Sequence, residues 1–226
     1  MKRIFHKITA ALLMLTLVSC AASGEISEQY GDSVQNADVF IDIPCLRQYG
    51  GYTCGTTCVQ MVMNYLYPYE ADINLASYEE KLGTDEVNGT SPEITVSFLE
   101  SEGVQVSAEE NRSNEWLIST LDRRHPVIMC VQAWSADGTY NTYDISDEDT
   151  YLSEGHWVIC VGYRRSDAGV RFYFNDPACV GHCYMDGSEL DKRWIDMSRD
   201  GKVYVRYGIE VFGDTVYDKN GVFHLD

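Results

Sequence analysis

Hydrophobic residues in the first half of the chain recur at spacings of three and four, which is the period of an amphipathic helix. We predict a long helix from Cys54 to about Tyr67, with Thr53 placed to cap its start and Pro68 to end it. The apolar stripe of this helix comprises Cys58, Met61, Val62, Tyr65 and Leu66.

Three shorter helices are predicted from start and stop signals farther along. They run from Asn74 to Leu82, from Ser91 to about Gly103 and from Asn114 to Arg124. Gly83 stands where the first of them would end, and Pro92 stands in the first turn of the second.

The second half of the chain changes to apolar runs separated by turn signals, which is typical of strands. We predict strands over Val127–Trp134, His156–Tyr163 and Val170–Asn175. The turn sequence Ser166–Gly169 joins the last two, so they should form an antiparallel hairpin.

Beyond this hairpin, Lys202–Phe212 reads as one long strand, and Asn220-Gly221 suggests a last hairpin turn. The polar stretch 135–154 is predicted to be a loop. Helices followed by antiparallel strands predict an α+β domain.

The N-terminus has the features of an export signal. Lys2, Arg3 and Lys7 precede an apolar run, Ile8–Val18, that is too short to span a bilayer as a permanent helix. Cys20 follows Ser19 at the end of that run, as in the bacterial lipoprotein signal, where such a cysteine receives lipid and becomes the mature N-terminus. An ordinary secretory signal that happens to contain a cysteine is the alternative.

These features divide the chain into a signal peptide over 1–19, a small, polar and acidic tether over 20–38, and one domain over 39–226. We therefore expect the protein in the bacterial cell envelope, exported and anchored to a membrane by lipid on Cys20.

Composition narrows the classes of partner. The 226 residues suit one domain, and they include 35 acidic and 17 basic residues. Removal of the signal takes away three basic residues and no acid, which moves the net charge from −18 to −21. This balance argues against binding to nucleic acid and against adhesion to anionic lipid through surface charge. It is compatible with cationic partners without implying one.

Chemistry concentrates around the predicted start of the long helix. Cys54 falls in its first turn, where unpaired N–H groups and the helix dipole favour a thiolate. The pair Gly50-Gly51 allows a tight turn upstream, and Gln48 lies six residues before Cys54 with an amide that can donate a hydrogen bond. The segment therefore suits nucleophilic catalysis by a thiolate.

Four segments, in one order, resemble the papain-like cysteine peptidase superfamily. They are Gln48 to Val59, Gly89-Thr90-Ser91-Pro92, Gly155-His156-Trp157 with the apolar strand after it, and Asn175-Asp176-Pro177. The branch they resemble is that of the bacteriocin-processing, double-glycine-leader peptidases and their stand-alone relatives, over roughly residues 43 to 195. The resemblance implies a papain-like fold, with N-terminal helices, the nucleophile at a helix start and an antiparallel sheet after them.

The resemblance also implies roles. Cys54 would attack a carbonyl carbon, His156 would form an ion pair with it and protonate the leaving group, and Asp176 would orient the imidazole. Gln48 and the Cys54 N–H would stabilise the oxyanion. The hairpin supports this grouping independently, since His156 opens one strand and Asp176 closes its partner.

Other readings of these residues stay open. Cys58 is a rival nucleophile that its place on the apolar stripe assigns to the core. Cys179, His182 and Cys183 could bind a metal, but zinc needs more ligands, so a local disulfide or free thiols is the favoured reading. The cysteines that remain after Cys20 and Cys54 could form up to three disulfides of unknown pairing: Cys45, Cys58, Cys130, Cys160, Cys179 and Cys183.

The functional expectation is a lipid-anchored peptidase or amidase that acts on a peptide or protein substrate outside the cytoplasm, as a monomer without cofactor or metal. One alternative is an acyl or γ-glutamyl transferase of transglutaminase-like type with the same triad, and another is a non-catalytic binding lipoprotein. The segment 133–154 is long for the resembling branch and could form a lid or a substrate wall. We do not expect bacteriocin maturation, because the chain carries no transporter segment.

Overall fold

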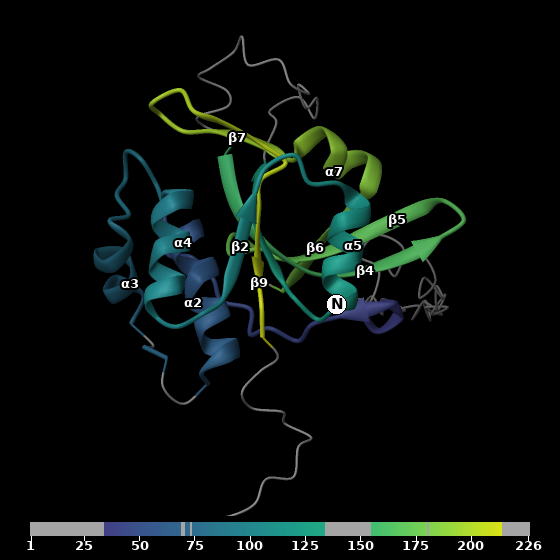
Figure 1. Ribbon diagram of the computed structural model, residues 1–226, viewed down its shortest axis with the longest axis horizontal. Helices are drawn as coiled ribbons and strands as arrows, with labels where there is room; N and C mark the ends of the chain where they lie inside the picture. Colours follow the sequence, from purple (N-terminus) through teal and green to yellow (C-terminus); the bar gives the residue numbers. More distant parts are fainter. Residues whose placement is uncertain (1–33, 69–70, 73, 134–154, 180, 214–226) are drawn as a thin grey trace, which may run out of the picture. The chain divides into compact units, whose positions relative to one another are not determined.

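A computed structural model describes residues 34–68, 71–72, 74–133, 155–179 and 181–213 (Figure 1). The predicted signal peptide, Cys20, most of the tether, the loop 135–154 and the turn at Asn220-Gly221 lie outside the described residues. Within the described ranges, the longest and most apolar helices fall short of what a membrane crossing requires.

The described residues form the α+β domain that the sequence predicts. A short 3-10 helix, η1 (Val34–Asn36), precedes the α-helices. The α-helices are α2 (Cys54–Leu66), α3 (Leu75–Leu82), α4 (Pro92–Ser101), α5 (Asn114–Asp122) and α7 (Gly187–Arg193). The first four confirm the predicted helices to within two residues at nearly every end, whereas α7 was not predicted.

Seven strands form the main antiparallel sheet of the described part of the chain, in the order β2-β9-β3-β4-β5-β6, with β1 paired to β4. Their bounds are β1 (Val39–Phe40), β2 (Val106–Glu109), β3 (Val127–Gln132), β4 (Gly155–Ser166), β5 (Gly169–Asn175), β6 (His182–Asp186) and β9 (Gly208–Val211). A small second sheet pairs β7 (Ile195–Met197) with β8 (Val203–Val205). The predicted β4–β5 hairpin is confirmed.

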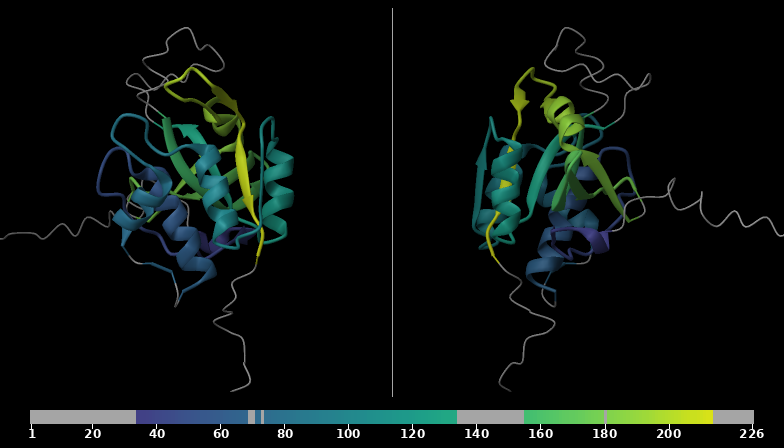
Figure 2. Two further views of the ribbon diagram at one scale, coloured as in Figure 1. Left: turned by 60° about the vertical axis from the view of Figure 1, so that its left-hand side comes forward. Right: turned by 90° about the vertical axis from the view of Figure 1, so that its right-hand side faces the viewer.

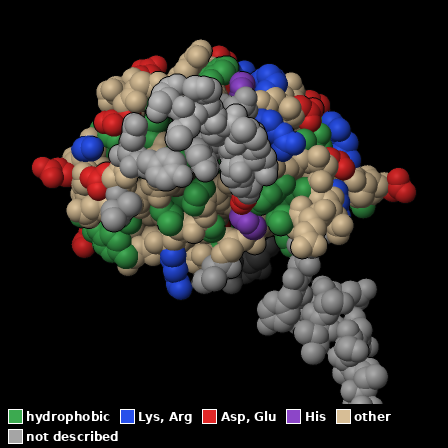
Figure 3. All heavy atoms as spheres, turned by 90° about the horizontal axis from the view of Figure 1, so that it is seen from below, with side chains coloured by type: hydrophobic (Ala, Val, Ile, Leu, Met, Phe, Trp, Pro, Cys, Tyr) green, Lys and Arg blue, Asp and Glu red, His purple; other side chains and the backbone are tan. Residues whose placement is uncertain are grey.

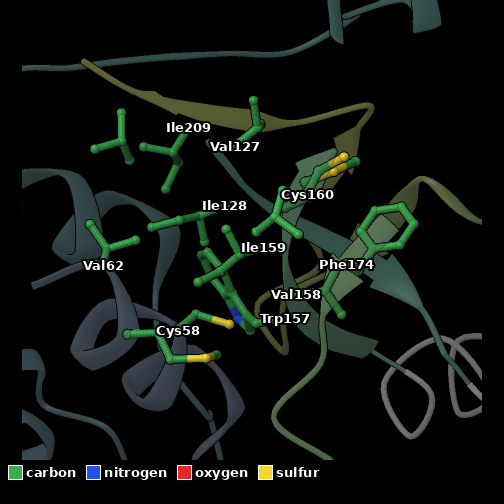
Figure 4. Packing of buried hydrophobic residues seen from close by; sticks show 14 of the residues in the cluster. Cys58, Val62, Val127, Ile128, Trp157, Val158, Ile159, Cys160, Phe174 and Ile209 are labelled. Carbon is green, nitrogen blue, oxygen red and sulfur yellow. The ribbon is translucent and has the colours of Figure 1, made fainter. Parts of the chain in front are cut away.

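Helices cover both faces of the main sheet. Figures 1 and 2 show α2, α3 and α4 gathered on one side and α5 on the other, where it packs against β1, β3 and β4. Figure 4 shows Cys58 and Val62 of α2 facing Ile128 of β3 and Trp157 of β4 across the core between them. These four side chains are nearly inaccessible to solvent, so the apolar stripe of α2 fills the core as predicted.

Local signals explain most helix ends. The Asn74 side chain accepts a hydrogen bond from the Ala76 N–H at the start of α3, and Gly83 ends α3 in the left-handed conformation with φ of 58°. The predicted cap at Thr53 is wrong in one respect, because its side chain makes no capping bond. The Thr53 hydroxyl instead donates to the Gly50 carbonyl at 3.2 Å and closes the turn before the helix.

The prediction of one strand over Lys202–Phe212 is also wrong. Arg206 has φ of 49°, which a regular strand does not tolerate, and it separates β8 from β9. The Arg206 N–H donates to the Trp194 carbonyl at 2.9 Å, which continues the pairing of β8 with β7 by one residue. The chain therefore leaves the small sheet at this residue and enters the main one.

Residues 34–38, which the sequence assigns to the tether, pack on the domain. The Asp38 N–H donates to the Tyr163 carbonyl at 2.9 Å, and the Asp38 carboxylate accepts from the Arg165 N–H at 2.7 Å. Figure 3 shows one face of the molecule, on which the described acidic, basic and apolar side chains are interspersed.

Candidate active site

Cys54 is the first residue of α2 and lies at the edge of the core, with 7% of its surface exposed. The next residue, Gly55, meets Thr90 closely enough that an added Cβ would come within 2.6 Å of the threonine Cβ. The hydroxyl of Thr56 lies 2.8 Å from that of Thr84 and 3.3 Å from that of Thr90, which are themselves 2.9 Å apart. This threonine triangle ties the start of α2 to the segment between α3 and α4.

His156 is the second residue of β4, and Asp176 directly follows β5. Because these strands pair antiparallel, the two side chains meet, and His156 Nε2 lies 2.7 Å from Asp176 Oδ1. Both are buried, with 1% and 9% of their surfaces exposed. A hydrogen bond also joins His156 to Cys54. Since Asp176 occupies Nε2, Nδ1 is the ring nitrogen left for the sulfur.

The charges of this group reinforce one another. Burial alone would lower the pKa of His156, but its hydrogen bonds and charge interactions with Asp176 and Cys54 raise it to about 9. Burial alone would raise the pKa of Asp176, but the hydrogen bond and charge of His156 hold it below its ordinary value. The pair therefore favours an imidazolium beside a carboxylate at neutral pH.

Asp176 also anchors the loop that follows it. Its Oδ1 accepts a second hydrogen bond, from the Ala178 N–H at 2.8 Å. Its Oδ2 lies 3.2 Å from the thiol of Cys179 and 3.8 Å from the thiol of Cys183, both of which donate to it. Four donors thus fix the position of this carboxylate.

Gln48 is hydrogen-bonded both to the loop after Asp176 and to the turn before Cys54. Its backbone N–H donates to the Pro177 carbonyl at 2.9 Å, which ties it to the Asp176 loop. Its side-chain Nε2 donates to the Gly50 carbonyl at 2.8 Å, and its buried Oε1 has no partner among the described residues. An amide nitrogen carries two hydrogens, so one remains to serve as a donor.

A cleft of about 510 Å³ reaches Cys54. Its lining includes two continuous stretches, residues 85–94 and residues 196–200, which we call its two walls, together with Gly155 and Trp157. The Arg199 guanidinium spans the two walls and donates to the Val87 carbonyl. The lining contains more acid than base: Asp85, Glu86, Glu93, Asp196 and Asp200 against Arg199.

Asp196 is a candidate site residue that the sequence did not reveal. It is half-buried in β7, lines the cleft and accepts two hydrogen bonds on Oδ1, from the Met197 N–H at 2.8 Å and from Gln132 Nε2 at 3.2 Å. Burial raises its pKa to about 7, although the Met197 N–H and the charge of His156 oppose the rise. Gly155 makes room for it, since an added Cβ there would lie 2.5 Å from Asp196 Oδ1. The glycine before His156 is thus the one local feature of the sequence that relates to this contact, and it does not identify Asp196 as the partner.

The competing candidates have other places in the fold. Cys58 is fully buried, which raises its pKa well above the ordinary value, so the prediction that it belongs to the core is confirmed. His125 contacts Glu210, and His182 lies 2.7 Å from the Asn175 side-chain oxygen. Within the described ranges, no cluster of His, Cys, Asp and Glu could hold a metal ion. The seven described cysteines are free thiols.

Comparisons with known proteins agree with this architecture. A protein described as a C39-like peptidase from Bacillus anthracis has the same fold, with a TM-score of 0.52, 12% sequence identity and coverage of 78% of this chain and 98% of its own. A double-glycine motif protease from an AMS/PCAT transporter, solved with the leader peptide, has a TM-score of 0.49, 15% identity and coverage of 77% and 96%. The peptidase domain of Streptococcus ComA, a bi-functional ABC transporter, has a TM-score of 0.48 and 15% sequence identity, with coverage of 74% of this chain and 96% of its own. A search of curated proteins found no match.

The fold and the matched sequence pattern define a cysteine peptidase of the papain-like superfamily. The match covers residues 40–202, well over half of the chain, and this protein belongs to the Peptidase_C39 like family.

Proposed function

We propose that this protein hydrolyses peptide bonds with Cys54 as nucleophile, His156 as acid and base, and Asp176 as the group that orients the imidazole. The observation that carries this proposal is the placement of one buried imidazole between a thiol at a helix start and a carboxylate 2.7 Å from its Nε2. The raised pKa of His156, about 9, favours the protonated ring that such a pair needs.

The proposed reaction begins when the Cys54 thiolate attacks the scissile carbonyl carbon and a C–S bond forms. The carbonyl oxygen becomes an oxyanion, which the Cys54 N–H and the free hydrogen of Gln48 Nε2 stabilise. The C–N bond then breaks, and His156 gives its proton to the leaving amine. Water, deprotonated by His156, attacks the thioester, releases the acid and regenerates the thiol.

The cleft supports a peptide as substrate. Its volume of about 510 Å³ suits a short extended segment rather than a whole folded protein, and its lining includes both Trp157 and Cys54. The excess of acidic side chains in its lining favours a neutral or basic segment over an acidic one. Among proteins of similar fold, the AMS/PCAT protease was solved in complex with the leader peptide.

We place this activity outside the cytoplasm, on a protein held to a membrane by lipid on Cys20, because the sequence before the domain has the order basic, apolar, small residue, cysteine. Expression in a bacterial host with radiolabelled fatty acid tests the anchor. Label should enter the wild-type chain and be absent from Cys20→Ala.

The catalytic assignment is tested with a thiol-reactive peptide electrophile and a peptide library. We expect the wild type and Cys58→Ala to be labelled and to cleave, and Cys54→Ala to do neither. Cleavage by Cys54→Ala at the wild-type rate would sink the proposal. Product analysis with added amine separates hydrolysis from acyl transfer, since only a transferase forms an amide with the amine.

A further inference from the structure

Two thiols share the outer oxygen of Asp176. Cys179 Sγ lies 3.2 Å and Cys183 Sγ 3.8 Å from Oδ2, the oxygen that does not contact His156. The one hydrogen of the Cys183 thiol can be donated either to Oδ2 or to the Cys179 sulfur. The two sulfur atoms are therefore neighbours of each other and of the carboxylate that the proposed mechanism uses to orient His156.

The hairpin between β5 and β6 brings these cysteines together. The Cys179 N–H donates to the Asp176 carbonyl at 3.1 Å, which turns the chain back, and Cys183 lies in β6 opposite Phe174. A thiol four residues from its partner on a closed turn is well placed for a short-loop disulfide. A third thiol, that of Cys45, donates to the backbone carbonyl of Gly181 in the same loop, at 3.2 Å.

We propose that Cys179 and Cys183 form a dithiol site that closes to a disulfide and thereby alters the charge beside Asp176 and His156. Nothing in the proposed hydrolysis uses either thiol. The site takes a disulfide oxidant as co-reactant, of the class to which oxidised glutathione and disulfide oxidoreductases belong. Oxidising compartments supply such oxidants and let disulfides persist.

The exposures of the two thiols set the order of events. Cys179 is exposed, and the hydrogen bond from Cys183 lowers its pKa, so Cys179 is the attacking thiolate. It attacks one sulfur of the oxidant, forms a mixed disulfide and releases the other half as a thiolate. Cys183 then loses its proton to solvent and attacks the Cys179 sulfur, which releases the second half. Two protein thiols are oxidised, and one external disulfide is reduced to two thiols.

Closure changes the electrostatics near the imidazole. In the reduced protein, the Cys179 thiolate carries a negative charge that interacts with His156 and Asp176, and the pKa of Cys179 is lowered by the hydrogen bond from Cys183. The disulfide is neutral, so this negative charge is absent after oxidation. His156 therefore loses one source of stabilisation for its proton when the site is oxidised, and it should deprotonate at lower pH.

Peptide mapping of the full chain tests the site itself. The protein is equilibrated in glutathione buffers of increasing oxidised fraction, free thiols are alkylated, and linkages are identified by mass spectrometry. We expect a Cys179–Cys183 linkage, retained in Cys45→Ser, and a glutathione adduct on Cys179 in Cys183→Ser. Persistence of both thiols in fully oxidised glutathione, or pairing of either with Cys45, would overturn the proposal.

The coupling to the active site rests on the proposed function and has its own readout. The rate of Cys54 alkylation by iodoacetamide, followed on the Cys54 peptide, is measured against pH in the reduced and oxidised protein. We expect the transition assigned to His156 to move down by roughly half a pH unit on oxidation. A linkage that leaves this transition in place overturns the coupling alone, whereas cleavage by Cys54→Ala overturns the proposed function.

Discussion

Two aspartates lie within electrostatic reach of His156, and their pKa values are shifted in opposite directions. Asp176, at the end of β5, receives four hydrogen bonds, which include one from the imidazole at 2.7 Å, and its pKa is lowered. Asp196, in β7, receives two on a single oxygen, and its pKa is raised to about 7 by burial. The number and charge of the donors, rather than burial alone, decides which carboxylate stays ionised.

This difference in pKa suits the two carboxylates to different electrostatic roles. A carboxylate that is ionised throughout the physiological range can hold an imidazolium in place. A carboxylate that titrates near neutrality on the wall of the cleft changes the charge that a bound peptide meets. In the proposed mechanism, the comparison therefore separates a residue that would orient the catalytic base from one that would shape the substrate site.

The largest effect should come from replacing Asp176 by asparagine, with the same substitution at Asp196 as the comparison. Asp176→Asn keeps the shape but removes the charge that orients and stabilises the imidazolium, so kcat/KM should fall by about 10³–10⁴-fold, as in other triads. Asp196→Asn should lower it less than about tenfold, because Asp196 does not contact the ring nitrogens. Equal losses in the two variants, measured on one peptide, would remove the distinction between them.

The pH dependence of catalysis sharpens the same contrast. The pKa of His156 is raised to about 9, so the protonated ring persists below that pH and is lost as the pH rises through it. Alkylation of Cys54 in the reduced wild type should show this upper transition near pH 9. In Asp176→Asn the transition should fall by at least about one unit, since the main stabilising charge is gone. An unchanged transition would mean that the shift has another source.

A substitution at Gly155 tests whether the close approach of the Asp196 side chain requires a residue without a Cβ at this position. Gly155→Ala places a Cβ 2.5 Å from Asp196 Oδ1, so it should lower the free energy of unfolding by about 1–3 kcal/mol. Gly51→Ala is the matched control, because a Cβ there meets nothing within 4 Å. Denaturant unfolding of both variants measures the difference, and equal midpoints would contradict the close approach.

The smallest effect concerns stability and pH. The pKa of Asp196 is raised in the folded state, so its ionisation opposes folding, and the contribution of this one residue to wild-type stability should fall as the pH rises from about 4 towards 7. Asp196→Asn removes this contribution. The free energy of unfolding of the variant, relative to that of the wild type, should therefore be higher at pH 8 than at pH 4.5, by on the order of 1 kcal/mol. Parallel pH profiles for the two proteins would show that Asp196 ionises freely.

Much of this arrangement could be predicted because its signals are local. Asn74, Ser91 and Pro92 mark helix starts by hydrogen bonding and fixed backbone angles, and the structure places helices at these residues. The turn at Ser166–Gly169 set the pairing of β4 with β5, and that pairing brings His156 to Asp176. Short-range chemistry was therefore enough to bring two of the three distant catalytic candidates together.

The missed features depend on long-range contacts. Arg206 has a positive φ at the point where the chain passes from β8, paired with β7, to β9, paired with β2 and β3, and no local sequence pattern predicts this change of sheet. Asp196 enters the cleft only because β3 and β4 lie beside β7, and its spacing from His156 in the sequence carries no period. The contact of the Cys179 and Cys183 thiols with Asp176 likewise depends on the path of the hairpin loop.

The triangle of Thr56, Thr84 and Thr90 has a consequence for what can enter the cleft. Hydroxyls of these residues, 2.8 to 3.3 Å apart, join the first turn of α2 to the wall that Thr90 helps to form. The first turn of α2, which carries Cys54, and that wall are thus joined by side-chain hydrogen bonds. The width of the cleft beside Cys54 is therefore set by these hydrogen bonds. We expect substrate specificity to depend on the size of the substrate side chains next to the cleaved bond.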